Sequence, residues 1–211
     1  MIQGKFIVLE GGEGSGKSTQ VKLLAERLRA HGVNAHVTRE VGGAPLAEEI
    51  RKLWLADRDG DWDSLTELLL IFAARREHLV KTIRPKLGEG AWVICDRFQD
   101  STLVYQGRAM GMPRADIQML YQMIAGGFYP NLILFLDVPV AVVRQRMAGR
   151  VLDRYERQDD AFHESLRQGY LQEAAEERKH DPQRGIVINA SGDIEAVHQS
   201  IWEAVQPLLE N

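Results

Sequence analysis

The sequence of 211 residues has little of three features that mark particular classes of protein. Cys95 is its single cysteine, so no disulfide can form within the chain, which suits a reducing compartment without requiring one. The net charge of -4 argues against broad nucleic-acid binding, because a basic surface supplies most of the affinity for a polyanion. No apolar run approaches the roughly 20 residues that span a bilayer, and the first residues show no signal-peptide pattern. We therefore expect a cytoplasmic protein that binds neither nucleic acid nor a membrane.

The apolar content of 45% and charged content of 27% are ordinary for a globular protein with a full core. Five short apolar runs bounded by turns have the pattern of buried parallel strands, at residues 6–10, 34–38, 91–95, 132–137 and 185–189. Amphipathic helical patterns separate these runs, which predicts βαβ units and a doubly wound α/β fold. Residues 39–90 form a longer connection than one crossover helix needs. We expect two or three helices there, with a kink or break around residues 57–63.

One segment carries a phosphate-binding motif. Residues 11–18 read GGEGSGKS and fit the pattern G-x-x-x-x-G-K-[ST] without a gap. The glycines allow positive φ angles and let backbone N–H groups close around an anion at the start of a helix. Lys17 would reach the β- and γ-phosphates, and the Ser18 hydroxyl would bind Mg²⁺. Because a predicted strand precedes the motif and a strong helical pattern follows it, a nucleoside triphosphate site is favoured over a glycine-rich turn.

The residues that follow the other strands point to the second substrate. Ligands of open α/β sheets bind at the carboxyl ends of the strands, where Asp96 and Arg97 follow the third predicted strand. Asp96 could hold the Mg²⁺ shell, with Asp137 as a competing candidate, although Asp96 and Arg97 could also form a simple surface ion pair. Arg39 and Arg51 would bring further positive charge to the same crevice. Converging arginines favour a dianionic acceptor such as a nucleoside monophosphate.

A cluster of arginines follows the fourth predicted strand and one short helix. Its members, spread around Gly149, are Arg144, Arg146, Arg150, Arg154 and Arg157. Such a run is often a solvated helix face. Its position beside the predicted phosphate crevice makes a lid that closes over the substrates the stronger interpretation here.

Several motifs together resemble those of the thymidylate kinases, in that family's order and at its spacings. They are the loop of residues 11–19, Thr38-Arg39-Glu40-x-Gly42-Gly43, Asp96-Arg97-Phe98, Ser101-Thr102-x-x-Tyr105-Gln106-Gly107 and Leu152-Asp153-Arg154-Tyr155-Glu156. The resemblance covers about residues 5–205. It implies the P-loop nucleoside-monophosphate-kinase fold, with a five-stranded parallel sheet flanked by helices and a short lid at about residues 146–160. The chain would be one kinase domain, 1–211, with the P-loop at 11–18 and an acceptor-binding region at about 39–107.

The resemblance also implies an activity. The expected reaction is direct in-line phosphoryl transfer from Mg-ATP to dTMP, by a homodimer. The alternatives are another small P-loop nucleotide or deoxynucleoside kinase, and a non-catalytic nucleotide-dependent switch. Apolar faces within residues 65–80 and 117–124 fit either a partner subunit or the core of one chain.

Carried over residue by residue, the resemblance implies these donor-side roles. The ATP-binding residues would be Gly11, Gly12, Glu13, Gly14, Ser15, Gly16, Lys17, Ser18 and Thr19, with Arg144 against the adenine. The metal ligands would be Ser18 and Asp96, and the catalytic groups would include Lys17, Asp96 and Arg97. One branch of the family has an arginine in the P-loop where this sequence has Gly14. The lid should therefore supply the mobile arginine, with Arg154 as first choice and Arg150 as second.

The resemblance implies that eight side chains bind dTMP and that one further residue packs against the thymine ring. Arg39, Arg51 and Arg97 would clamp the phosphate, Glu13 would hold the sugar 3′-hydroxyl or a metal-bound water, and Tyr105 would crowd the 2′ position. Arg75 would donate to thymine O4, Thr102 and Gln106 would meet the thymine edge, and Phe72 or Ile71 would pack against the ring. The ring contact and Tyr105 could equally be core residues, and Gln106 could cap a turn. One departure concerns Val41, which stands where the family has proline. The Glu40–Val41 bond is then either trans in a reshaped turn or cis and strained.

Overall fold

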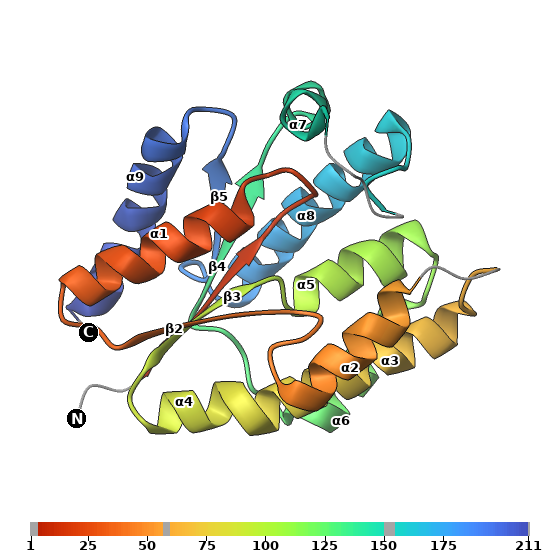
Figure 1. The fold of residues 1–211 in the computed structure, drawn as a ribbon, viewed down its shortest axis with the longest axis horizontal. Helices are drawn as coiled ribbons and strands as arrows, with labels where there is room; N and C mark the ends of the chain where they lie inside the picture. The colour runs from red at the N-terminus through yellow and green to blue at the C-terminus, as the bar shows by residue number, and fades with distance from the viewer. Residues whose placement is uncertain (1–3, 57–59, 150–154, 211) are drawn as a thin grey trace.

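The computed structural model describes residues 4–56, 60–149 and 155–210, which form a five-stranded parallel sheet with helices on both faces (Figure 1). The strand order is β2-β3-β1-β4-β5. The strands are β1 (Phe6–Glu10), β2 (Ala35–Arg39), β3 (Trp92–Asp96), β4 (Leu132–Asp137) and β5 (Gly185–Asn189). The sequence predicts β1, β4 and β5 with these bounds, while β2 and β3 each lie one residue further along the chain. The predicted fold class is confirmed.

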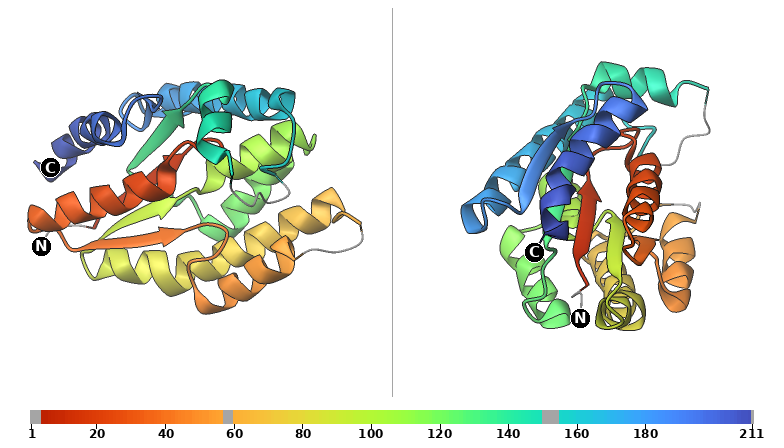
Figure 2. Two further views of the ribbon diagram at one scale, coloured as in Figure 1. Left: turned by 45° about the horizontal axis from the view of Figure 1, so that its top comes forward. Right: turned by 90° about the vertical axis from the view of Figure 1, so that its left-hand side faces the viewer.

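The central strand shows why the apolar runs are continuous. Phe6 and Val8 pack into one core cluster, and Ile7 and Leu9 pack into the other, because successive side chains of a strand point to opposite faces. Helices cover both faces, so neither set meets water, and all of β1 is buried. Figure 2 shows α1 and α8 on opposite sides of the sheet.

The helices divide between the two faces. They are α1 (Lys17–Ala30), α2 (Pro45–Leu55), α3 (Ser64–His78), α4 (Arg84–Gly88), α5 (Gln99–Thr102), α6 (Arg114–Ala125), α7 (Val140–Met147), α8 (Asp160–His180) and α9 (Ile194–Val205). Two π-helical segments, η1 (Leu79–Ile83) and η2 (Leu103–Ala109), extend α3 and α5, and a 3₁₀ turn, η3 (Gln206–Leu209), follows α9. α1, α7 and α9 pack in one core cluster, whereas α3, η2, α6 and α8 pack in the other.

The connection from β2 to β3 contains the break that the sequence predicts. α2 ends at Leu55, and α3 begins after Asp63, whose carboxylate accepts hydrogen bonds from the N–H groups of Leu65 and Thr66 at 3.1 Å. α2 and α3 pack through a small apolar cluster that includes Ala47 and Ile71. At its C-terminal end, α3 reaches the carboxyl ends of β2 and β3, where His78 contacts Thr38 and Arg75 donates to the carbonyl of Phe98. In the part of the chain that the structure describes, no helix is both long and apolar enough to cross a membrane.

Candidate active site

A cavity of about 1110 Å³ lies at the carboxyl ends of the strands. Its walls come from the loop after β1, the ends of β2 and β3, the inner faces of α2 and α3, η2, and the start of α9. The parallel arrangement brings these segments together although they are distant in sequence. Every motif that the sequence analysis singled out contributes to this cavity where it is described.

The loop of residues 11–18 has the conformation that its glycines predict. Gly11, Gly14 and Gly16 have φ angles of 143°, 66° and 94°, and Gly16 precedes the first residue of α1. The Lys17 ammonium folds back over the loop and donates to the carbonyl oxygens of Gly11 at 3.0 Å and Gly12 at 2.7 Å. Burial lowers the pKa of Lys17 to about 8, and the nearby guanidinium of Arg97 acts in the same direction. This end of the cavity therefore holds a cation that lacks a full counter-charge.

The two predicted metal ligands meet. The Ser18 hydroxyl donates to Asp96 Oδ2 at 2.6 Å, although 78 residues separate them. Asp137, the competing candidate, instead forms a two-pronged ion pair with Arg167 at 2.6 and 3.0 Å. Hard oxygen donors side by side next to a phosphate loop suit Mg²⁺, which takes few protein ligands and completes its shell with phosphate and water oxygens. The Ser18 and Asp96 side chains therefore fit the ion that the sequence predicts.

Arg97 lies at the centre of a second polar group between the loop and η2. Its guanidinium donates to Glu13 Oε1 at 2.6 Å, to the Tyr170 hydroxyl at 2.6 Å and to the Gly11 carbonyl at 2.9 Å. The Tyr105 hydroxyl also donates to Glu13 Oε1, at 3.0 Å. Burial alone would raise the pKa of Glu13, but Arg97, Lys17 and Tyr105 outweigh it and hold the pKa at about 2. Glu13 thus stays a carboxylate beside the cavity.

The other two predicted phosphate-binding arginines lie on the same wall. Arg39, whose side chain is 55% exposed, pairs with Glu48 at 2.9 Å, and Arg51 donates to the carbonyl of Val41 at 2.7 Å. Burial, and then the positive charge of Arg39, lower the pKa of Arg51. Because Arg39, Arg51 and Arg97 all line the cavity, a bound anion would relieve their mutual repulsion.

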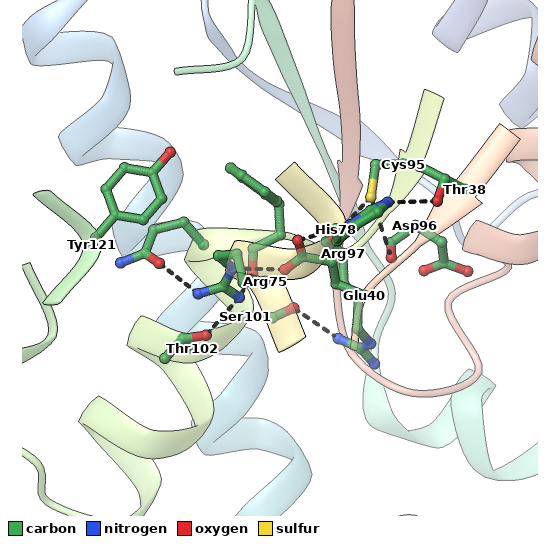
Figure 3. A network of polar contacts seen from close by, with 12 residues as sticks. Thr38, Glu40, Arg75, His78, Cys95, Asp96, Arg97, Ser101, Thr102 and Tyr121 are labelled. Carbon is green, nitrogen blue, oxygen red and sulfur yellow. Dashed lines mark hydrogen bonds and ion pairs between the residues drawn. The ribbon is translucent and has the colours of Figure 1, made fainter. Parts of the chain in front are cut away.

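Arg75 occupies the far end of the cavity and is almost fully buried on α3. Its Nε donates to Glu40 Oε2 at 2.6 Å, and its terminal nitrogens donate to Gln99 Oε1 at 2.7 Å and Thr102 Oγ1 at 2.9 Å. Figure 3 shows the guanidinium held between Glu40 and Thr102. Burial would raise the pKa of Glu40, but the charge of Arg75 outweighs it and holds the pKa below its usual range. Arg75 is thus fixed in direction before any ligand arrives.

The same network reaches the glycine pair after β2. His78 Nδ1 lies 3.0 Å from Glu40 Oε1, and its Nε2 lies 2.6 Å from Thr38 Oγ1 (Figure 3). Because a carboxylate only accepts, Nδ1 carries the proton that bonds to Glu40. A Cβ at Gly43, where φ is 81°, would collide with the imidazole of His78, so glycine is required there. Of the two conformations left open by the sequence, the Glu40–Val41 peptide bond has the cis form.

The predicted base-edge residues gather beyond Arg75. Thr102, Tyr105 and Gln106 are buried and line the cavity. Of the two candidates for the ring contact, Ile71 lines the cavity, whereas Phe72 lies in the core cluster beneath the sheet. Both residues are within one helical turn of Arg75, but they lie on either side of it. Ile71 faces the cavity, whereas the Phe72 ring lies 5.1 Å from the Arg75 guanidinium carbon on the side of the core cluster.

Comparisons with known proteins agree with this geometry. The family model described as Thymidylate kinase matches residues 9–201. A thymidylate kinase of Pseudomonas putida is 48% identical over 210 residues, covering 99% of this chain and 98% of that protein. One from Magnetococcus marinus is 44% identical over 207 residues, covering 97% of each chain. The solved structure of a thymidylate kinase from Ehrlichia chaffeensis superposes with a TM-score of 0.74 at 36% identity, covering 96% of this chain and 99% of the other.

The chain belongs to the thymidylate kinase family. It is therefore a nucleotide kinase of the transferase class, and the family's activity pairs ATP as donor with dTMP as acceptor in the synthesis of dTTP.

One arginine of this family member does not lie where the sequence predicts it. Arg144, predicted to lie against adenine, donates instead to Asp160 and to the carbonyl of Gln158, both at 2.6 Å, and so holds the start of α8 against α7. Among the described residues that line the cavity, Arg146 is present and Arg144 is not. Arg146 donates to the carbonyl of Ala190 at 2.9 Å, beside the loop that leads to α9. The predicted catalytic arginines, Arg150 and Arg154, lie outside the described residues.

The sequence analysis missed the buried carboxylates that hold the acceptor end. Glu40 was noted only as part of a motif, and Glu67 was not noted at all. A signal for Glu67 exists in the spacing of Glu67, Ile71 and Arg75, which are four residues apart and share one face of α3. A carboxylate inside an apolar helical run, aligned with a buried arginine, indicates a polar site rather than core.

Proposed function

We propose that this chain transfers the γ-phosphoryl group of Mg-ATP directly to the phosphate of dTMP, in line, within a single kinase domain of residues 1–211. One observation carries the proposal: a single cavity joins the P-loop, at which a triphosphate would bind, to the buried Arg75, which is suited to a pyrimidine carbonyl. The cationic side chains of Lys17, in the P-loop, and Arg97, beside it, line this cavity and would face the phosphoryl group where charge develops during transfer.

The proposed donor site uses mainly the backbone. The N–H groups of residues 11–18 and the start of α1 would bind the β- and γ-phosphates, and Lys17 would turn from the loop carbonyls toward them. Ser18 and Asp96 would hold Mg²⁺, which would supply neutralisation of charge on the phosphate oxygens. In place of Arg144, we propose Arg146 as the arginine on the adenine side, because it lines the cavity next to the start of α9.

The proposed acceptor site reads dTMP from the phosphate to the base. Arg39, Arg51 and Arg97 would bind the dianionic phosphate, which would lessen the repulsion among them. Glu13 and Tyr105, already hydrogen-bonded to each other, would face the 3′-hydroxyl and the 2′ position of the sugar.

Base recognition is proposed for the far end of the cavity. Arg75 would donate to O4, Thr102 and Gln106 would meet the base edge, and Ile71 rather than Phe72 would pack against the ring. The support for this arrangement is that Arg75, Thr102, Gln106 and Ile71 all line the cavity and that buried partners fix the direction of Arg75.

An acceptor panel tests the proposal. Initial rates would be measured with Mg-ATP and dTMP, dUMP, UMP, CMP and AMP in turn, with ADP release as the readout. We expect the highest kcat/KM with dTMP. Preference for another acceptor would indicate a different small kinase, and ATP binding without acceptor-dependent ADP release would indicate a non-catalytic switch.

The lid arginine is a separate part of the proposal. A Cβ at Gly14 would lie 3.1 Å from side-chain atoms of Val143 and Met147, at a φ of 66° that disfavours any other residue. A P-loop arginine is therefore poorly accommodated, which supports Arg154, with Arg150 second, as the source of the mobile charge. We expect Arg154→Ala to lower kcat at least ~10²-fold with a modest change in KM. An unchanged kcat would remove Arg154 from the mechanism, and the same assay on Arg150→Ala would show whether Arg150 takes the role.

We also propose a cytoplasmic homodimer. Leu65 and Leu69 on α3 and Met119 and Met123 on α6 are exposed apolar side chains, and α3 and α6 pack against each other. Sedimentation equilibrium at micromolar concentration should give twice the mass of the 23.8 kDa chain. A monomer at that concentration would contradict the proposal.

A further inference from the structure

The amide of Gln106 faces two different surroundings. Gln106 belongs to η2, is buried, and lines the cavity near Arg75. Its Nε2 donates to Glu67 Oε1 at 2.8 Å. Among the described residues, no group donates to its carbonyl Oε1. One end of the amide is therefore committed to the protein, and the other remains available to a ligand.

Glu67 determines which end of the Gln106 amide, the NH₂ group or the carbonyl oxygen, faces the cavity. Its Oε1 also accepts a hydrogen bond from the Tyr155 hydroxyl at 2.7 Å, so two donors converge on one carboxylate oxygen. A carboxylate offers acceptors only, whereas the two ends of an amide differ, one being a donor and the other an acceptor. Rotating the Gln106 amide by half a turn would place its carbonyl oxygen against Oε1 of Glu67, and two acceptors would then face each other in a buried site. The carboxylate therefore holds the Gln106 carbonyl oxygen away from itself.

This orientation matches one class of pyrimidine. Thymine and uracil carry N3–H, a donor, between two carbonyl oxygens. Cytosine carries an unprotonated N3, an acceptor, beside an amino group. The carbonyl oxygen of Gln106 would accept a hydrogen bond from N3–H of thymine, but it would face the lone pair on N3 of cytosine. Leaving a buried polar group without a partner costs more free energy than a typical hydrogen bond contributes, so cytosine would bind poorly.

We propose that Glu67 is a specificity-determining positioning residue, which fixes the direction of the Gln106 amide so that the enzyme accepts 4-oxopyrimidine and rejects cytosine nucleotides. The inference rests on the proposed function, because it requires the base to lie beside Arg75 and Gln106. Glu67 itself does not touch the base. Arg75, which would donate to O4, makes an independent contribution to the same discrimination.

Tyr155 has a distinct part in this arrangement. It lies just before α8, and its ring packs at 84° to Tyr105 with centroids 5.3 Å apart. Because its hydroxyl donates to the Oε1 position of residue 67, that position favours an oxygen that can accept a hydrogen bond. Replacing Glu67 by glutamine should therefore leave the amide carbonyl of residue 67 facing Tyr155 and Gln106, and the direction of the Gln106 amide should persist.

The test is the ratio of kcat/KM for dTMP to kcat/KM for dCMP. Glu67→Leu should lower this ratio at least ~10-fold through KM of the acceptor, with KM for ATP unchanged. Glu67→Gln and Tyr155→Phe should each keep the ratio within about threefold of wild type, because each retains one acceptor that directs the Gln106 amide. Glu67→Met, which has about the length of glutamate and lacks the carboxylate, should lower the ratio as Glu67→Leu does.

A double-mutant cycle tests whether Glu67 acts through Gln106. In the Gln106→Leu background, Glu67→Leu should change the ratio no further. An equal additional fall in that background would overturn the inference, as would an unchanged ratio in the folded Glu67→Leu enzyme. If Glu67→Leu fails to fold, Glu67→Met gives the decision, and an unchanged ratio in that variant would overturn the inference. A wild-type enzyme inactive with dTMP would refute the proposed function, whereas an active one with a ratio insensitive to residue 67 would refute only the role of Glu67.

Discussion

The donor and acceptor ends of the cavity are built in different ways. At the donor end, eight consecutive residues, 11–18, supply backbone groups and one ammonium, and these lie together because they are adjacent in the chain. At the acceptor end, side chains from the turn after β2 and from α3, α5 and η2 meet only after the sheet and helices have packed. The donor end is thus a local structure, and the acceptor end is a product of the tertiary fold.

The two ends also differ in how their charges are compensated. The Lys17 ammonium bonds to carbonyl oxygens, and its pKa is lowered to about 8, mainly by burial. The Arg75 guanidinium has a carboxylate partner at 2.6 Å. The donor end is therefore electrostatically incomplete until a phosphate binds, whereas the acceptor end is already preorganised. Substitutions at the two ends should separate activity from stability.

The largest effect is expected at the donor end. Lys17→Met should lower kcat about 10³-fold, because a positioned cation that stabilises the transferring phosphoryl group is lost. Thermal unfolding should occur at the same temperature as in wild type or higher, since the lowered pKa means that burial disfavours the charged form. Steady-state kinetics and calorimetry would check both parts. A clear loss of thermal stability would contradict the distinction between the two ends.

The next effect is expected at the acceptor end and concerns stability. Glu40→Gln leaves the buried Arg75 charge uncompensated and should lower the free energy of unfolding by about 3 kcal/mol. KM for dTMP should rise, because Arg75 loses its fixed direction, while KM for ATP should not. Urea unfolding at neutral pH is the measurement, because the lowered pKa of Glu40 makes its contribution present above about pH 4.5 and lost as the pH falls below that value.

A matched substitution on the surface provides the control for Glu40→Gln. Glu49 forms an exposed ion pair with Lys52, so Glu49→Gln should leave the free energy of unfolding nearly unchanged. Equal effects of the two substitutions would mean that the buried pair contributes no more than an exposed one.

The same difference explains what could be predicted from the sequence. The P-loop, the strands and the break before α3 depend on local periodicity and on neighbouring residues, and these predictions are confirmed by the fold. The inward face of α3 was left open between Ile71 and Phe72, because apolar spacing alone does not say which side of a helix meets a cavity. The choice between Arg144 and Arg146 depends on how α7 packs against α8, since Asp160 attracts the first of them. Such contacts between separate helices cannot be predicted from the spacing of residues within one helix.

The smallest effect is a pH dependence confined to the donor end. Because Lys17 has a pKa of about 8 in the protein without ligand, it is mostly charged at pH 7 and about one-tenth charged at pH 9. If ATP binds the charged form, its affinity should fall about tenfold between these two values, with proton uptake on binding at the higher pH. Titration calorimetry in buffers of different ionisation enthalpy measures both quantities. The phosphate of dTMP is already dianionic at pH 7, so dTMP affinity should stay nearly constant over this range. A parallel fall in the affinity for dTMP would place the titrating group in a region shared by both substrates, and a constant affinity for ATP would show that Lys17 keeps its proton through pH 9.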